Sequence, residues 1–375
     1  TEEPSLPTCT FAYYRFCHFT EIEGWNRLPH GGPRVAGGAC HIIAPMHIVV
    51  APDSFKGTAN SSLAAAGLAS GIRQELPEAT VVTCPLADGG EGTAHTLATA
   101  ASLTGRQLDR VCIPSVDALG RLTEAEYYLD LETATAYIDV AAATGLPAVT
   151  DSPDPLRADS FGTGALIADA ETRGAKSIVL GLGGSATIDG GIGILCALGA
   201  APHDARGLAL AQGPAELVRL GDIDTAQLNY KAGMLDYTLL ADTRCTPREA
   251  PAMYGPQKGA NREQVALLTG ALLSLCEFTE EDPTTEYFGA AGAIPVGLSW
   301  MSRILWGNDE HVRVLSGAEY VADALDLDRH LAEADAVVTG EGRFDAQSLT
   351  GKAVGTVVDR AAASPYPFVG SVRCV

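Results

Sequence analysis

Three of the five lysines in this chain stand next to a glycine, at Lys56-Gly57, Lys258-Gly259 and Gly351-Lys352. A lysine in a glycine turn can present its ammonium group as a compact charge to an anion that approaches the bare backbone. The alternative is a solvated lysine in an ordinary glycine-rich turn. Because arginine supplies nearly all the other positive charge, the placement of the few lysines favours anion-binding turns.

Carboxylates stand in the same kind of turn, each directly after a short apolar run. They are Asp53, Asp88 with Glu91, Asp189, Asp242, and Glu341 with Asp345. Carboxylates among glycines can hold a divalent cation through their oxygens, or accept a proton from an attacking hydroxyl. Any one of them alone is more commonly a helix cap or a turn former. Five such positions together favour a functional cluster.

The segment Gly181-Leu182-Gly183-Gly184-Ser185-Ala186-Thr187 also follows an apolar run. Its backbone amides and hydroxyls would suit phosphate oxygens. The segment matches G-x-G-x-x-A as well, but no acidic residue ends a following strand at the spacing that a dinucleotide site requires. A Walker A loop is excluded at Lys352, because Ala346 and Ala353 stand where glycine and Ser or Thr are needed.

The elements that must position these residues alternate along the chain. Predicted strands cover 47–51, 80–84, 136–140, 177–180, 238–241 and 336–339, and predicted helices cover 62–75, 161–174, 190–199, 261–276 and 353–363. This alternation is typical of an α/β fold with largely parallel sheets, whose chemistry gathers at the carboxyl ends of the strands. Residues 201–230 and 279–300 lack the pattern and are expected to be loops or a domain junction.

Residues 1–45 differ from the rest of the chain. They show neither helical nor strand periodicity, and they lack the basic and apolar regions of a secretory signal. Met46 stands directly before the first clear strand. We therefore expect residues 1–45 to be a disordered or non-native leader.

Length and charge narrow the function further. The 375 residues suit two domains, and 25 Lys and Arg against 46 Asp and Glu give a net charge of −21. Such a chain repels phosphate backbones and anionic lipid, so neither nucleic acid nor a membrane is an expected partner. Nine cysteines without a CxxC pair predict no disulfide framework and no zinc site, and favour a cytoplasmic protein.

Six segments together resemble the type 1 glycerate kinase family: IVVAPDSFKGT (48–58), PLADGGEGT (85–93), SFGTGALI (160–167), GLGGSATIDGGIG (181–193), YGPQKGA (254–260) and VVTGEGRFDAQSLTGKAVG (337–355). The resemblance implies ATP-dependent phosphorylation of D-glycerate, with 2-phospho-D-glycerate favoured over the 3-phospho isomer. It also implies two α/β domains with the active site in the cleft between them. A Rossmann-like domain would comprise 46–84 and 296–375, and an inserted α/β domain 85–295.

The requirements of phosphoryl transfer assign roles to the matching residues. The expected catalytic residues are Asp53, Lys56, Asp189, Lys258, Glu341, Asp345 and Lys352. Contacts to substrate or ATP are expected from Ser54, Asp88, Gly89, Gly90, Glu91, Gly183, Gly184, Ser185 and Thr187. Mg²⁺ would be held by Asp189, Asp242 or Glu341, and which carboxylate is the base stays open. The expected partners are ATP and D-glycerate, with a homodimer as an open alternative.

Three departures from the family pattern keep other interpretations open. TRCTPREAPAM (243–253) is shorter and more basic than its counterpart, and GAAGAIPVG (289–297) places Ile294 and Pro295 in a loop that is otherwise glycine-rich. The chain also stops early, so the Rossmann-like domain is expected to be truncated. The main alternative is a catalytically inactive relative that binds a small hydroxy acid or a nucleotide. A nicotinamide-dependent dehydrogenase would rest on the glycine fingerprint alone.

Overall fold

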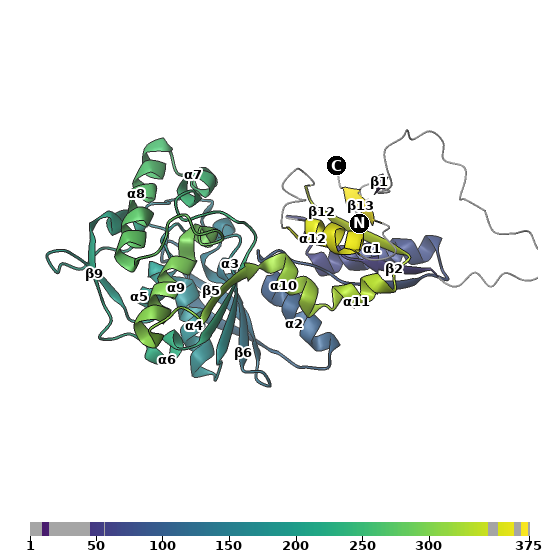
Figure 1. The fold of residues 1–375 in the computed structure, drawn as a ribbon, viewed down its shortest axis with the longest axis horizontal. Coiled ribbons are helices and arrows are strands. Elements are labelled where there is room, and N and C mark those ends of the chain that lie inside the picture. The colour runs from purple at the N-terminus through teal and green to yellow at the C-terminus, as the bar shows by residue number, and fades with distance from the viewer. Residues whose placement is uncertain (1–9, 15–45, 56, 344–351, 364–368, 374–375) are drawn as a thin grey trace, which may run out of the picture.

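The computed structural model describes residues 10–14, 46–55, 57–343, 352–363 and 369–373. They form two lobes, each built on its own sheet (Figure 1). The smaller lobe holds five strands in the order β1-β13-β12-β2-β3, and the larger lobe holds six in the order β11-β10-β7-β6-β5-β4. The fold is therefore α/β with two sheets, which confirms the expected fold class.

The smaller sheet is parallel except at one edge. Its strands are β1 (Thr10–Tyr14), β2 (His47–Val50), β3 (Thr80–Thr83), β12 (Ala336–Glu341) and β13 (Val369–Arg373). Ile48 and Val50 of the inner strand β2 pack against Ala65 of α1 (Ser61–Glu75). Val49 packs in the cluster formed with α10 (Gly317–Ala324), α11 (Leu327–Ala332) and α12 (Ala353–Ala363). A parallel strand buried on both faces is an uninterrupted apolar run, which is why the sequence predicts it.

The larger sheet is mixed. Its strands are β4 (Asp109–Val116), β5 (Leu122–Asp130), β6 (Thr135–Asp139), β7 (Ser177–Gly181), β10 (Asp236–Ala241) and β11 (Val312–Ser316). The last four run parallel, whereas β5 and β4 extend the sheet antiparallel. The sequence analysis missed this hairpin because it sought uninterrupted apolar runs, and antiparallel strands with one wet face alternate instead.

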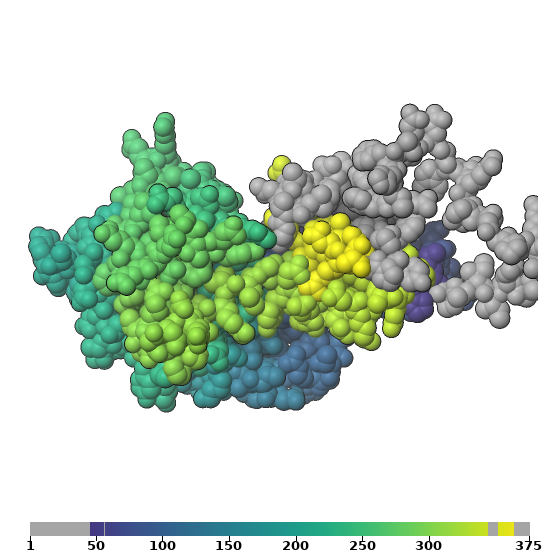
Figure 2. All heavy atoms as spheres, in the orientation of Figure 1, coloured from purple at the N-terminus to yellow at the C-terminus, as the bar shows by residue number. Residues whose placement is uncertain are grey.

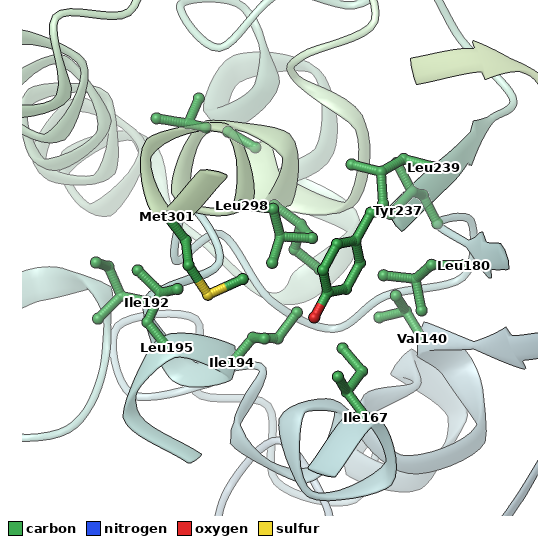
Figure 3. Packing of buried hydrophobic residues seen from close by; sticks show 14 of the residues in the cluster. Val140, Ile167, Leu180, Ile192, Ile194, Leu195, Tyr237, Leu239, Leu298 and Met301 are labelled. Atoms are coloured by element: carbon green, nitrogen blue, oxygen red, sulfur yellow. The ribbon is translucent and has the colours of Figure 1, made fainter. Parts of the chain in front are cut away.

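Helices α4 (Phe161–Thr172), α5 (Ile192–Ala197) and α9 (Ala290–Trp306) cover one face of the larger sheet, and α8 (Arg262–Thr279) packs against α9. Figure 3 shows Tyr237 and Leu239 of β10 facing Ile194 of α5 and Leu298 of α9. The buried Tyr237 hydroxyl donates to the Ala232 carbonyl over 2.7 Å, so its polar atom is satisfied. This core packs against β7 and β10 and so fixes the position of their carboxyl ends.

Helices α2 (Thr93–Leu103) and α10 cover the opposite face and lie between the lobes. One apolar cluster contains Val179 and Leu240 of the larger sheet, Val321 of α10, and Val49 and Val337 of the smaller sheet. The lobes therefore share core contacts, and Figure 2 shows the green larger lobe meeting the yellow-green helices of the smaller one. None of the described helices is long and apolar enough to cross a membrane.

The limits of the two units differ from those expected. Residue 296 lies inside α9, and β11 is still a strand of the larger sheet, so sheet membership returns to the smaller lobe only after Ser316. We therefore propose 85–316 as the larger unit, with the described residues of 46–84 and 317–373 in the smaller. Of the expected leader, Thr10–Tyr14 pair with β13, and 1–9 and 15–45 lie outside the described residues, so the leader stays a prediction.

Two segments expected to be irregular are ordered. Within 201–230, β8 (Ala201–Asp204) and β9 (Leu220–Asp224) form a two-stranded antiparallel sheet around the 3₁₀ helix η2 (Pro214–Arg219). Within 279–300, the chain enters α9. Short strands with polar residues and helices that contain proline carry weak sequence signals, which explains both misses.

Helix α9 begins with a left-handed turn. Ala291, Gly292 and Ala293 have φ angles of 52°, 70° and 70°. The turn is tied to the segment after β7, because Gly190 N–H donates to the Gly292 carbonyl over 2.9 Å. Pro295 follows in the first right-handed turn, where its missing N–H forfeits no helical hydrogen bond. The segment 289–297, which was expected to be a loop, therefore contains a strained left-handed turn that is hydrogen-bonded to the chain after β7.

Replacing Ala291 with glycine should raise the free energy of unfolding by about 0.5–1 kcal/mol. A left-handed alanine costs about 1–2 kcal/mol, and the greater freedom of glycine in the unfolded chain offsets part of the gain. Guanidinium denaturation measures the change. The matched control is Ala66→Gly on the exposed side of α1, which should lower stability by about 1 kcal/mol. Equal losses in both variants would contradict a strained turn.

Candidate active site

The loop Asp88–Glu91 crosses the carboxyl ends of β7 and β10, with backbone lying directly on backbone. Gly183 N–H donates to the Gly89 carbonyl over 2.8 Å. Gly89 has a φ of 98°, and a Cβ there would lie 2.6 Å from the Leu240 carbonyl oxygen. A Cβ on Gly183 would lie 2.6 Å from the Gly90 Cα. The glycines selected from the sequence are therefore needed for two distant loops to touch.

Asp88 shapes this loop from a buried position. Its Oδ1 accepts a hydrogen bond from the Gly90 N–H over 3.1 Å. Gly317, the first residue of α10, lies so close that a Cβ there would overlap the Asp88 carbonyl oxygen. The Glu91 side chain is exposed. Asp88 thus stabilises the turn where the lobes join, whereas Glu91 is the carboxylate of this loop that solvent reaches.

Asp139, at the end of β6, was missed by the sequence analysis. Its two carboxylate oxygens accept hydrogen bonds from Gly92 N–H (2.8 Å) and Ala94 N–H (3.0 Å), so it caps the start of α2. Burial raises the pKa of Asp139 to about 7, against the lowering effect of these two bonds and with a small contribution from the charge of Glu91. Asp242 was selected because it follows an apolar run. Asp139 also follows one, so the same signal could have identified Asp139.

The raised pKa of Asp139 predicts a pH dependence of stability. Its folded-state pKa of about 7 exceeds the unfolded value of about 3.9, so the folded state binds more protons between these limits. Stability should then fall as pH rises from about 4 to 7, by at most about 1.4 kcal/mol per pH unit. In the variant Asp139→Asn, the free energy of unfolding should not show this decrease between about pH 4 and 7, because the side chain no longer titrates. Urea denaturation at several pH values compares the two proteins, and parallel pH profiles would contradict the assignment.

The hydroxyls of Ser185 and Thr187 bond to each other. Ser185 Oγ accepts from Thr187 N–H over 2.9 Å, and the two hydroxyl oxygens lie 2.8 Å apart. Both side chains are buried, whereas Gly184, with a φ of 78°, is exposed. The hydroxyls fix the shape of this loop, and the exposed backbone around Gly184 is the part that a phosphate could approach.

Lys258 is buried directly against this loop, only 4% exposed. Its Nζ donates to the Thr187 carbonyl oxygen over 2.7 Å. Burial lowers the pKa of Lys258 to about 8, and the negative charges of Asp189 and Asp242 partly oppose the fall. At neutral pH the group is therefore mostly protonated. It places a positive charge close to two carboxylates and to the backbone of the glycine loop.

The carboxylate of Asp189 is saturated by hydrogen bonds. It accepts from Ser160 N–H (2.8 Å) and Oγ–H (2.7 Å), from Gly193 N–H (2.9 Å) and from Gly191 N–H (3.2 Å). Ser160, which the sequence analysis quoted within a motif but did not select, thus ties α4 to the segment after β7. With four donors on its oxygens, Asp189 has the geometry of a positioning residue.

A second group of selected residues lies at the carboxyl ends of β2 and β12. Asp53 N–H donates to the Gly340 carbonyl over 2.8 Å, which brings Asp53 beside Glu341. Ser54 N–H donates to Asp53 Oδ1 over 2.6 Å. Lys352 stands just before α12, where its carbonyl accepts the first-turn N–H of Thr356. Lys56 and Asp345 lie outside the described residues.

The two groups meet through the chain that follows β3. Leu86 N–H donates to the Pro52 carbonyl over 2.9 Å, one residue before Asp53. Asp88 comes two residues later, and two residues span at most about 7 Å. The carboxyl ends of both sheets therefore converge on residues 86–91. This convergence is what α/β folds use to build a site from several strands.

Comparison with known proteins identifies the family of this chain. Residues 48–372 match the model of the glycerate kinase family. The chain belongs to the glycerate kinase family. The glycerate kinase of Haemophilus influenzae is 36% identical over 335 residues, covering 88% of this chain and 86% of that protein. The glycerate 2-kinase of Escherichia coli K12 is 35% identical over 332 residues, covering 87% and 84%.

A solved structure agrees. The crystal structure described as glycerate kinase 2 from Salmonella typhimurium LT2 superposes with a TM-score of 0.71 at 36% identity, and the match covers 87% of this chain and 86% of that one. As a member of the glycerate kinase family, the chain is a kinase. Two of the motifs that carried the resemblance, 85–93 and 181–193, are the loops that pack on each other at the ends of β7 and β10.

Proposed function

We propose that this kinase, as a type 1 member of its family, transfers the γ-phosphoryl group of ATP to D-glycerate and forms 2-phospho-D-glycerate. The family membership and the names of the relatives support glycerate as the acceptor. The observation that carries the proposal within the structure is the convergence of the two sheet edges on residues 86–91. There, glycine backbone, one buried cation and several carboxylates come together, which are the parts that phosphoryl transfer requires.

The glycine loop and the lysines would bind the anionic groups. Exposed backbone around Gly184 offers N–H groups to phosphate oxygens, and Lys258 supplies charge behind it. Lys352, before α12, would face the second anionic group, the carboxylate of glycerate or another phosphate, and we assign Lys56 the same kind of role. Holding both reactants in place supplies much of the catalysis in this reaction class.

In the transfer step, the 2-hydroxyl oxygen of glycerate attacks the γ-phosphorus of ATP. The bond from that phosphorus to the oxygen bridging to the β-phosphate breaks, and ADP leaves. The hydroxyl proton passes to a carboxylate. We propose Asp53, Asp242 or Glu341 for this base, since each lies at or shortly after the carboxyl end of a strand at the converging edges. Asp189, whose oxygens already accept four hydrogen bonds, is proposed instead to hold the loop in shape.

The carboxylates fit a magnesium ion that is shared with ATP. Mg²⁺ commonly binds one or two carboxylates together with substrate phosphates. Among the described residues, no group of three or more His, Cys, Asp or Glu side chains could hold a metal by itself, which is compatible with such a shared site. We propose Asp242 and Glu341 as its protein ligands. When bound, Mg²⁺ would neutralise charge on the transferred phosphoryl group.

Phosphorus NMR of a reaction containing the purified chain, ATP, Mg²⁺ and D-glycerate tests the proposal. We expect ADP and a new phosphomonoester whose phosphorus couples to the single proton on C2. Coupling to the two protons of C3 would overturn the assignment of 2-phosphorylation, but the proposal that the chain phosphorylates D-glycerate would stand. Binding of ATP by a folded protein without any product would favour the inactive relative.

A further inference from the structure

A cavity of about 390 Å³ opens in the larger lobe, beside the last residues of the 181–193 segment. It is formed by the end of β4, the starts of α4 and α5, and the chain that runs from β8 into η2. This volume lies within the range of sites that hold small organic molecules. All of its lining residues are among those that the structure describes.

The lining is apolar on most sides and acidic at one corner. Val116, Phe161, Ile192 and Leu217 supply the apolar walls, and Asp159 with Asp189 forms the corner. No lysine, arginine or histidine of the described part of the chain lines the cavity. A site of this composition repels the carboxylate of glycerate and the phosphates of ATP, because no lining cation offsets the two carboxylates. It is therefore not part of the proposed kinase site.

Asp159 is the acidic group that remains able to bind a ligand. The oxygens of Asp189 already accept four hydrogen bonds, whereas Asp159 Oδ1 accepts one backbone hydrogen bond, from Phe161 N–H over 3.0 Å. The Asp159 side chain also accepts a hydrogen bond from Gln212, a neutral residue that lines the cavity too. Burial and the charge of Asp189 raise the pKa of Asp159 to about 6, so the corner carries negative charge at neutral pH.

We propose that this cavity binds a small primary amine with an apolar body, its ammonium group against Asp159 and its body between Phe161 and Leu217. Charge complementarity selects the cation, since a buried carboxylate beside a second one is stabilised by an opposite charge. The apolar walls select a compact hydrocarbon part. The proposal does not depend on which substrate the kinase site takes.

An occupant would touch the segment that also builds the kinase site. Asp189, Ile192 and Gly193 line the cavity, and Gly193 N–H is one of the four donors to Asp189. Two residues before Asp189, the Thr187 carbonyl accepts from Lys258. Binding in the cavity is therefore expected to restrict the loop that carries this carbonyl.

Thermal unfolding and calorimetry with three matched probes test the proposal. Benzylamine, benzyl alcohol and benzoate share one apolar body and differ in charge. At pH 7.5 we expect the full chain to bind benzylamine at least tenfold more tightly than benzyl alcohol, and benzoate not at all. Asp159→Asn, which keeps an oxygen for Phe161 N–H, should abolish the preference for the amine.

Two further variants locate the binding. Ala211 lies exposed at the cavity wall, so Ala211→Phe should block binding of benzylamine while leaving the melting temperature of the free protein nearly unchanged. Ala226→Phe, equally exposed but outside the cavity, should bind like the unmodified chain. The proposal is overturned if benzyl alcohol or benzoate binds as tightly as benzylamine, if no probe binds, or if Ala211→Phe leaves binding intact.

Discussion

Replacing Lys258 with methionine should lower D-glycerate-dependent ADP formation at least about 100-fold, while the protein stays folded. Methionine occupies similar volume but removes the one buried positive charge next to the Thr187 carbonyl and near Asp189 and Asp242. The positive charge that offsets part of the negative charge of Asp189 and Asp242 is then missing beside the loop that an anionic phosphate must approach. At 5–6 Å and an effective dielectric of about 20, one such charge is worth about 3 kcal/mol.

Steady-state kinetics measure this loss, and circular dichroism checks the fold. The matched control is Lys176→Met, which removes an exposed lysine at the opposite end of β7 and should retain the turnover of the unmodified chain. A Lys258→Met protein with more than a tenth of that turnover would show that the buried ammonium group has no part in the chemistry.

Gly183→Ala is expected to have the second large effect. The added Cβ would lie 2.6 Å from the Gly90 Cα and 3.2 Å from its nitrogen, so the two glycine loops must move apart. Backbone cannot yield as the tip of a side chain can, and the hydrogen bond from Gly183 N–H to the Gly89 carbonyl is weakened as well. We expect turnover to fall at least about 100-fold, since displacing reactants by about 1 Å costs about two orders of magnitude.

Two other glycines calibrate this result. A Cβ at Gly90 would meet only the Asp88 Oδ1, at 3.0 Å, so Gly90→Ala should lose less activity than Gly183→Ala. Gly67 lies in α1 with nothing within 4 Å of a Cβ, and Gly67→Ala should stabilise the protein by about 0.5–1 kcal/mol at unchanged turnover. Near-normal turnover in a folded Gly183→Ala protein would contradict the close packing of the loops.

The residue types and spacings predicted the part of this architecture that depends on local pattern. The sequence predicted the apolar strands at 47–51 and 177–180 and the glycine loop that follows the second strand. Both kinds of element restrict the residue types within a few positions, because parallel strands are buried on both faces and tight turns require glycine. The antiparallel hairpin of β4 and β5 and the left-handed turn of α9 were missed. They depend on one-sided burial and on contacts with distant chain, such as the hydrogen bond between Gly190 and Gly292.

The site shows the same division. Gly89 and Gly183 were recognised as loop glycines, but only the structure shows that each is needed to let the other loop approach. Asp189 was expected to hold metal or accept a proton, and its partners include Ser160, 29 positions away, which no spacing rule predicts. Asp139 follows an apolar run, as Asp242 does, but its role as the cap of α2 appears only when α2 is placed over the end of β6.

The central claim is that the loops brought together at residues 86–91 act on one phosphoryl transfer. ADP release by the purified full chain with ATP and Mg²⁺, measured over a range of D-glycerate concentrations, tests it most directly. The account predicts saturable ADP formation that requires D-glycerate, yields one phosphoglycerate per ADP, and disappears in Lys258→Met but not in Lys176→Met. ADP formation that ignores D-glycerate, or a folded chain that binds ATP and forms no ADP, would contradict it.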